Sequence, residues 1–234
     1  LACHTVLSPD RVRAQLAAQH GGADAIFDGN GSRTGGARLL AVVSVKEGEQ
    51  GRHYRLPTDR DHQAVLNART KLDLVARTPL PGGLNPVPDE PTPAGGGSGA
   101  GRAFSVQKYG MMTFGDLFTA RQKLGLVVLG RAARVVSLGS DPCDALKQSA
   151  ALVASRCADY NSALARWAVA GEFVGNTFGR QALPPVWDFC ETVLLSEESG
   201  GYPGALEWVA KVIERQGSAS LSIGQSRLSD ACSS

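Results

Sequence analysis

The sequence lacks the features that mark several common classes of protein. No apolar run approaches the roughly 20 residues of a membrane-spanning helix, so no membrane association is predicted. No basic segment followed by an apolar one is present at the start, so no signal peptide is predicted. The absence of any Cys-x-x-Cys pair argues against a zinc ribbon in this chain, and no metal ligands are predicted. The five cysteines are odd in number and widely spaced, which argues against a disulfide framework and predicts a cytoplasmic location.

Signatures of common enzymes are missing as well. The chain has no Gly-x-Ser-x-Gly sequence, and its four histidines fall in the first third without an evident nucleophile. Residues 95–101 are glycine-rich like a phosphate-binding loop, but a Pro-rich stretch precedes them where such a loop needs a strand. A flexible linker is therefore the better interpretation of this run. We predict neither catalytic nor cofactor-binding residues within the chain.

The composition of the 234 residues is that of an ordinary globular protein. Hydrophobic residues make up 43% of the chain, which argues against global disorder. The formal net charge is only +2, so the charge balance neither requires nor excludes nucleic acid as a partner.

Residues 1–77 are predicted to form a small α+β region. Ser8 can cap a short helix whose first position is Pro9. Residues 28–31 read Asp-Gly-Asn-Gly, which is a strong turn signal.

A β-hairpin and a helix are expected in the second half of this region. Residues 37–45 have the composition of a strand, and residues 53–56 can return as its partner. A helix is predicted to follow, with its cap at Thr58 or Asp59.

Residues 78–104 hold most of the clustered prolines and a Gly/Ser-rich run. Such a composition buries little apolar surface. We interpret this segment as an exposed loop or linker and as the best candidate for a boundary.

Residues 105–234 are predicted to be mainly helical, and they begin with a distinctive stretch at 109–122. Thr119 and Gln122 have the spacing of a capping box, which predicts a helix from about Thr119 towards Ser137.

Three more helices are expected in this region, beginning near Asp141, Val186 and Pro203. The first carries an apolar face from Leu146 to Leu164, and the last is expected to end at Gly217. A short strand is predicted at 218–223.

Four side chains are candidates for the wall of a substrate pocket, namely Arg121, Arg180, Trp187 and Asp188. The last three lie near a Pro-Pro break, which suits either a pocket wall or a buried ion pair. Arg121 belongs to a helix that could present basic residues to phosphates or to solvent.

The sequence Leu183-Pro184-Pro185-Val186-Trp187 is similar to the acidic-Pro-Pro-aromatic motif of amino methyltransferases. That chemistry needs a polar first residue that accepts a hydrogen bond from the target amine, and an aromatic ring for the flipped base. Leu183 cannot accept a hydrogen bond and Trp187 comes one position late. We therefore reject this segment as a catalytic motif.

Four blocks of sequence occur in an order that points to one protein family. The first block is residues 35–43 with 51–58, and the second is residues 109–122. The third block is residues 158–162 with 166–167. The fourth is residues 176–189, in which positions 179 and 185 do not belong to the block. Together they resemble a family of large bacterial proteins described as adenine-specific DNA methylases. Proteins of this family carry an amino-terminal domain of unknown function and often a zinc ribbon. The cysteines of that zinc ribbon are missing from this chain, apart from Cys3 at the position of its edge.

The resemblance implies transfer of a methyl group from S-adenosylmethionine to an adenine amino nitrogen in DNA. The parent protein is expected to have an α/β, Rossmann-like methyltransferase fold with large insertions. Its glycine-rich cofactor motif would precede these blocks and its Asp-Pro-Pro-Tyr motif would follow them, and neither occurs in this chain. We therefore expect a middle segment of the enzyme that is inactive alone and binds no cofactor alone, with DNA as a partner through the parent.

A second hypothesis is a self-contained, non-catalytic helical module that binds DNA or a protein partner. A third is a purely structural scaffold. The flanking coding sequence would discriminate the first hypothesis from the second.

Overall fold

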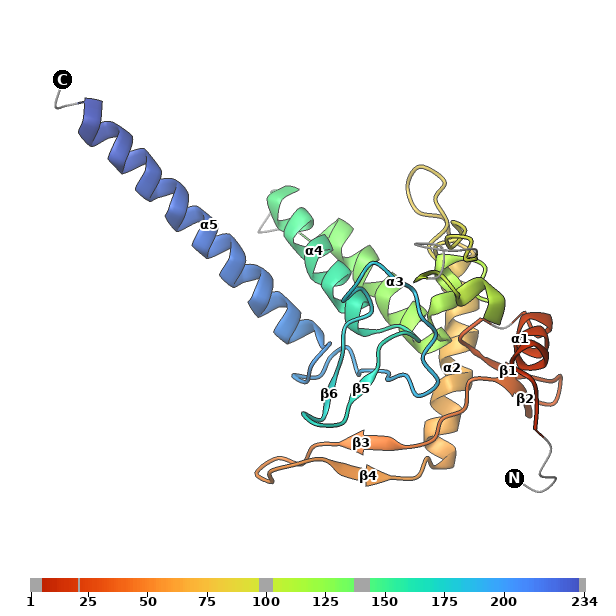
Figure 1. The fold of residues 1–234 in the computed structure, drawn as a ribbon. Coiled ribbons are helices and arrows are strands. Elements are labelled where there is room, and N and C mark those ends of the chain that lie inside the picture. The colour runs from red at the N-terminus through yellow and green to blue at the C-terminus, as the bar shows by residue number, and fades with distance from the viewer. Residues whose placement is uncertain (1–5, 21, 97–102, 137–143, 232–234) are drawn as a thin grey trace.

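The computed structural model describes the backbone of residues 6–20, 22–96, 103–136 and 144–231, with side chains up to residue 217. Figure 1 shows short strands and one short helix on one side of the molecule and a row of longer helices beside them. The last helix projects away from the body. The described part is therefore mainly helical with small antiparallel hairpins, which confirms the α+β prediction for this chain.

The amino-terminal helix α1 spans Pro9–Ala18, and the Ser8 side chain accepts a hydrogen bond from the Arg11 backbone N–H, as predicted. The predicted turn at 28–31 joins strand β1 (Ala25–Phe27) to strand β2 (Arg33–Gly36). The Asp28 carboxylate accepts hydrogen bonds from the backbone of residues 30 and 32, which stabilises the turn. The sequence predicted this turn but not the hairpin that it closes.

The predicted second hairpin is confirmed, but its strands are shorter than expected. Strand β3 is Val42–Ser44 and strand β4 is His53–Arg55, with Val42 opposite Arg55. In this register Leu40 would lie opposite Pro57, which has no backbone N–H to donate to a ladder. The pairing therefore ends before most of the predicted strand at 37–45 can join it.

Four helices form a row in which each packs against the next along the chain. They are α2 (Asp59–Ala76), α3 (Ala120–Val135), α4 (Asp144–Tyr160) and α5 (Tyr202–Ala231). Thr58 and Thr119 are the N-caps of α2 and α3, and both have capping boxes, so these predicted starts are confirmed. The predicted start of α4 at Asp141 lies outside the described residues.

The described residues of the segment 78–104, which are 78–96 and 103–104, are largely exposed, but some of them pack on the stretch at 109–122. The Gly115 N–H donates to the Pro88 carbonyl at 2.9 Å, and the Thr92 N–H donates to the Met112 carbonyl at 2.9 Å. Thr92 is buried, and its hydroxyl donates to the Met111 carbonyl. The boundary predicted between residues 77 and 105 stays a prediction, since these contacts join the segment to the region that follows it.

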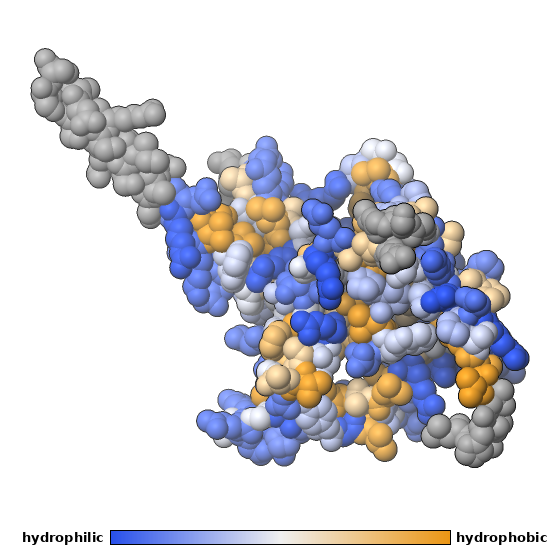
Figure 2. Space-filling view, in the orientation of Figure 1, coloured by the Kyte–Doolittle hydropathy of each residue, from blue (hydrophilic) through white to orange (hydrophobic). Residues whose placement is uncertain are grey.

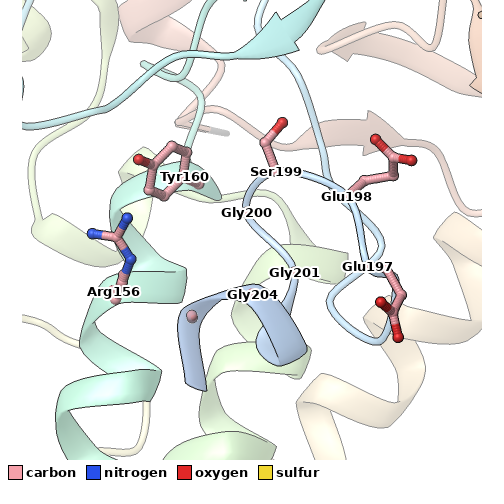
Figure 3. Close-up of a pocket in the computed structure, with 9 residues that line it drawn as sticks. Arg156, Tyr160, Glu197, Glu198, Ser199, Gly200, Gly201 and Gly204 are labelled. Carbon is pink, nitrogen blue, oxygen red and sulfur yellow. The ribbon is translucent and has the colours of Figure 1, made fainter. Parts of the chain in front are cut away.

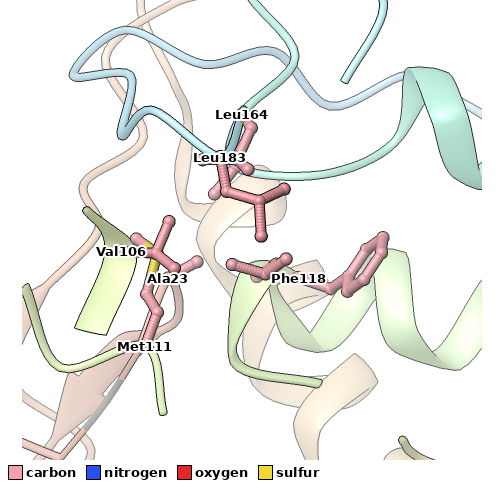
Figure 4. Close-up of a cluster of buried hydrophobic side chains, with 8 residues drawn as sticks. Ala23, Val106, Met111, Phe118, Leu164 and Leu183 are labelled. Atoms are coloured by element: carbon pink, nitrogen blue, oxygen red, sulfur yellow. The ribbon is translucent and has the colours of Figure 1, made fainter. Parts of the chain in front are cut away.

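A hydrophobic cluster anchors the two 3₁₀ turns η2 (Val106–Tyr109) and η3 (Phe114–Leu117) against the chain around 163–183. Figure 4 shows its side chains meeting from separate segments. Val106 and Leu117 are fully buried, and Leu183 is 4% exposed. Leu183 is therefore part of the hydrophobic core.

Three predictions for the carboxyl-terminal half are wrong. No helix begins at Val186, because residues 187 and 188 form a bend and the Cys190 N–H donates to the Ala165 carbonyl at 2.8 Å. The apolar face expected up to Leu164 ends earlier, since α4 stops at Tyr160. Residues 218–223 are not a strand: α5 continues through them, because a single glycine at 217 costs a helix only about 1 kcal/mol.

The sheets of the described residues are two-stranded and antiparallel, and the third pairs β5 (Trp167–Ala168) with β6 (Phe173–Val174). A Rossmann-like fold needs an open, mostly parallel sheet, and none is present in the part of the chain described here. Among these residues, no helix is long and apolar enough to span a membrane.

Candidate functional site

The third and fourth blocks meet at the carboxyl-terminal end of α4. The Asp159 carboxylate accepts hydrogen bonds from the Asn176 side chain at 2.7 Å and from the Phe178 N–H at 2.8 Å. The Asp159 carbonyl accepts a third from the Thr177 N–H. One acidic residue therefore holds the whole 176–178 loop against α4.

Ser162 and Thr177 form a buried pair beside this loop. Their hydroxyl oxygens are 2.8 Å apart, and the Ser162 oxygen also accepts a hydrogen bond from the Leu164 N–H at 3.0 Å. Ser162 is fully buried and Thr177 is 5% exposed. Buried hydroxyls need hydrogen-bond partners, and these bonds join the chain after α4 to the 176–178 loop.

Asn161 ties the next loop to the same helix end. Its side-chain amide donates to the carbonyls of Cys157 at 2.9 Å and Gly200 at 3.0 Å, and its oxygen accepts from the Thr192 N–H at 3.2 Å. The side chain is fully buried. Its two hydrogen bonds to residues 192 and 200 place the 192–201 loop where it forms one wall of a pocket.

This pocket has a volume of about 180 Å³ and lies where α5 begins (Figure 3). Arg156 and Tyr160 of α4 form one side of it. The loop that leads into α5 forms the other side with Ser199 and Gly200, and Gly204 of the first turn of α5 also lines the pocket. Glu197 and Glu198 also line it, so its walls combine an arginine, an aromatic ring, two carboxylates and backbone.

Arg156 is held between two aromatic rings. Its guanidinium carbon lies 4.1 Å from the centre of the Trp208 ring and 5.5 Å from that of Tyr160. Such contacts stabilise a cation by about 0.5–2 kcal/mol. The N–H groups of a stacked guanidinium lie in the plane of the guanidinium itself, so they point away from the aromatic faces.

Glu198 ties the same loop to the second hairpin. Its carboxylate pairs with the Arg52 guanidinium at 2.7 Å. Tyr54 donates a hydrogen bond to Glu172 at 2.6 Å, so the first block also contacts the loop between β5 and β6.

Arg121, the first predicted pocket residue, is part of an ion pair. Its guanidinium lies 2.6 Å from the Glu191 carboxylate, and the two side chains are 29% and 20% exposed. Its Nε atom is buried without a hydrogen-bond partner among the described residues. This geometry joins the start of α3 to the chain after the fourth block.

Arg131, on the same predicted basic face, also makes contacts within the chain. Its guanidinium donates to the carbonyls of Val75 at 2.9 Å and Thr78 at 2.6 Å, which satisfies carbonyls at the end of α2. Arg121 and Arg131 therefore do not form a free basic face for phosphates.

Arg180, Trp187 and Asp188 are all exposed, so the alternative of a buried ion pair is wrong. None of the three, and not Arg121, lines the pocket at α5. Their role in binding a substrate stays a prediction.

The structure brings Trp187 to a partner that the sequence did not indicate. The centres of the Trp187 and Tyr109 rings are 5.9 Å apart and nearly perpendicular, at 86°. These residues belong to the fourth and second blocks. Both were singled out in the sequence, but their separation along the chain concealed the contact.

Cys157 is a buried free thiol and Cys190 a partly buried one. Burial raises the pKa of both, that of Cys190 to about 11, where Asp188 adds a smaller effect of the same sign. Within the described ranges, no cluster of three or more His, Cys, Asp or Glu side chains could hold a metal ion.

Comparisons with models of protein families, with curated proteins and with solved structures found no match to this chain.

Proposed function

We propose that this chain is a non-catalytic segment of an S-adenosylmethionine-dependent, adenine-specific DNA methyltransferase, with DNA as its partner through the parent protein. The observation that carries the proposal is the packing of the blocks that define the resemblance. The second and third blocks meet at a backbone hydrogen bond, in which the Ala163 N–H donates to the Leu117 carbonyl at 2.7 Å. Ala163 lies between the two parts of the third block, and Leu117 lies in the second block. The fourth block joins the third through Asp159 and the second through Trp187.

If the blocks are shared by a family because they build a common fold, they should contact one another in the structure. The first block contacts the packed unit of the other three through the Arg52–Glu198 ion pair. The resemblance and the packing together support one inserted module.

The module is proposed to be non-catalytic for two reasons. The sequence contains neither the glycine-rich cofactor motif nor Asp-Pro-Pro-Tyr. In the described residues the only sheets are short two-stranded hairpins, whereas a Rossmann-like site places its cofactor at the edge of a parallel sheet. In the proposal, the remainder of the parent protein supplies both the cofactor site and the catalytic residues.

The source DNA on both sides of this segment tests the proposal. We expect one open reading frame that places a glycine-rich cofactor motif upstream and Asp-Pro-Pro-Tyr downstream. Stop codons at both edges would overturn it. A calorimetric titration of the chain alone with S-adenosylmethionine provides a second test, in which micromolar binding would contradict the proposed role.

The second candidate is an independent helical module that binds a protein partner, and the surface of α5 favours it. Leu206, Trp208 and Ile213 are each about half exposed on this helix, at 46%, 54% and 49%. Figure 2 shows apolar side chains gathered where α5 lies beside α4. A helix with apolar residues on several faces is usually covered by another protein surface.

A further inference from the structure

Trp187 stands out because it is both exposed and supported. Its side chain is 69% exposed, although a tryptophan in water forgoes a large hydrophobic gain. Tyr109 meets it in an edge-to-face contact that restrains the ring. A restrained aromatic surface that remains open is typical of residues that bind a partner.

Tyr109 is itself supported from α1. The Arg13 guanidinium carbon lies 5.8 Å from the centre of the Tyr109 ring, and its Nε donates to the Tyr109 hydroxyl at 3.4 Å. Helix α1 also packs against η2, the turn that carries Tyr109. Three separate segments thus build one surface cluster, which consists of Arg13, Tyr109 and Trp187.

The elements around this cluster are basic. Helix α1 and turn η2 carry Arg11, Arg13 and Lys108 against one carboxylate, Asp10, which pairs with Arg13 at 3.0 Å. On the remaining side, Asp188 adjoins Trp187 in sequence and is exposed. A polyanion would therefore be attracted from the side of α1 and η2 and repelled by Asp188.

We infer that the Arg13–Tyr109–Trp187 cluster is a binding surface for single-stranded DNA, on which an unpaired base stacks on Trp187. An exposed aromatic face suits any base, and nearby cations suit the phosphates that follow it. A base within a duplex is already stacked and cannot reach such a ring. The exposed charges around Trp187 are less suited to a protein partner, whose anchoring residues need a dry, apolar surround.

The choice of DNA over RNA rests on the proposed function, whereas the recognition of unpaired bases rests on the cluster alone. The inference goes beyond that function because it assigns a contact surface to named residues. It requires no methyltransferase domain in the assay.

The test is a fluorescence-anisotropy titration of a labelled oligothymidylate, about 12 nucleotides long, with the 234-residue chain and its variants. We expect Trp187→Ala to weaken binding by about tenfold or more, the loss typical of one stacked base. Lys108→Gln is expected to weaken binding and to reduce its salt dependence. Asp188→Asn is expected to strengthen binding about twofold, because it removes a like charge near the phosphates.

Trp208→Ala is the matched control, because Trp208 is also an exposed tryptophan beside an arginine but lies on α5, on the opposite side of the molecule from α1. It is expected to bind the oligonucleotide like the unmodified chain. Circular dichroism of each variant checks that the helices are intact.

Three results would overturn the inference: no binding by the unmodified chain, equal binding by Trp187→Ala, or equal affinity for a duplex of the same length. Because the titration needs no cofactor, it fails or succeeds independently of the flanking reading frame. Failure here with a methyltransferase frame in the source DNA would leave the proposed function intact.

Discussion

The side-chain amide of Asn161 donates a hydrogen bond to the Gly200 carbonyl, 39 residues further along the chain, at 3.0 Å. This contact and the bond from the Thr192 N–H make Asn161 the link between the end of α4 and the loop that lines the pocket. The side chain is completely buried, so each of its bonds replaces one that water would otherwise make.

Asn161→Ala is expected to lower the free energy of unfolding by about 2–4 kcal/mol, because it removes two hydrogen bonds to partly buried backbone groups at 192 and 200. Urea denaturation followed by circular dichroism measures the change. Gln148→Ala, at an exposed position of the same helix, should change stability by less than about 0.5 kcal/mol. Equal effects of the two substitutions would contradict the role assigned to Asn161.

Gly200 and Gly204 offer a pair of substitutions with opposite expected signs. Gly200 has a φ of +89°, and a Cβ there would lie 2.7 Å from the Tyr160 Cβ, so Gly200→Ala should destabilise the fold by about 1–3 kcal/mol. Nothing lies within 4 Å of a Cβ at Gly204, which is in the first turn of α5. Gly204→Ala should therefore stabilise the protein by about 0.4–1 kcal/mol. Thermal unfolding of both variants would show the two shifts, and a loss of stability in Gly204→Ala would count against this geometry.

The Arg121–Glu191 pair is expected to contribute more than an exposed pair, because both side chains are mostly buried. Arg121→Gln should destabilise the chain by about 1–3 kcal/mol, since it leaves a carboxylate partly desolvated and unpaired. The double variant with Glu191→Gln should cost less than the sum of the single changes.

The exposed Lys211–Glu207 pair on α5, also 2.6 Å apart, is the control for this prediction. Lys211→Gln should change stability by less than about 0.5 kcal/mol. If urea unfolding shows additive effects at Arg121 and Glu191, the pair does not stabilise the fold.

Cys190 should resist thiol reagents near neutral pH, because burial raises its pKa from 9.0 to about 11. Because the pKa of Cys190 is higher in the folded chain than in the unfolded one, the protonated thiol contributes to the free energy of unfolding. This contribution is complete below pH 9 and is lost as the pH rises through about 11. A variant with serine at positions 3, 143 and 232 keeps only Cys157 and Cys190. Its reaction with Ellman's reagent near pH 8 should be slow when folded and complete when unfolded in guanidinium. Rapid labelling of the folded variant would show that the thiol is accessible.

Local signals in the sequence predicted local structure well. Ser8, Thr58 and Thr119 marked three helix starts, because an N-cap needs only a side-chain oxygen and the backbone N–H groups two or three residues later. The turn at 28–31 was predictable for the same reason. The predicted helix at Val186 failed because the chain there pairs with residues 165 and 166, which no local pattern reveals.

The candidate site was predicted only in part. The sequence singled out Trp187 and Arg121, since their chemistry is visible in the residue itself. It could not show that Trp187 meets Tyr109 or that Arg121 meets Glu191, because both partners are distant along the chain. The pocket at α5 was missed because its lining residues come from α4 and from a loop about 40 residues later, and no local pattern shows that they meet.

By itself the sequence determined the mainly helical character of the chain, its capped helix starts, the second hairpin and the blocks that carry the resemblance. These depend on residues within a few positions of one another, or on residue type alone. The tertiary structure decided where strands stop, that α5 continues past Gly217, and which side chains face one another. Those outcomes depend on hydrogen bonds and burial between segments many residues apart, such as Asn161 with Gly200, which only folding brings together.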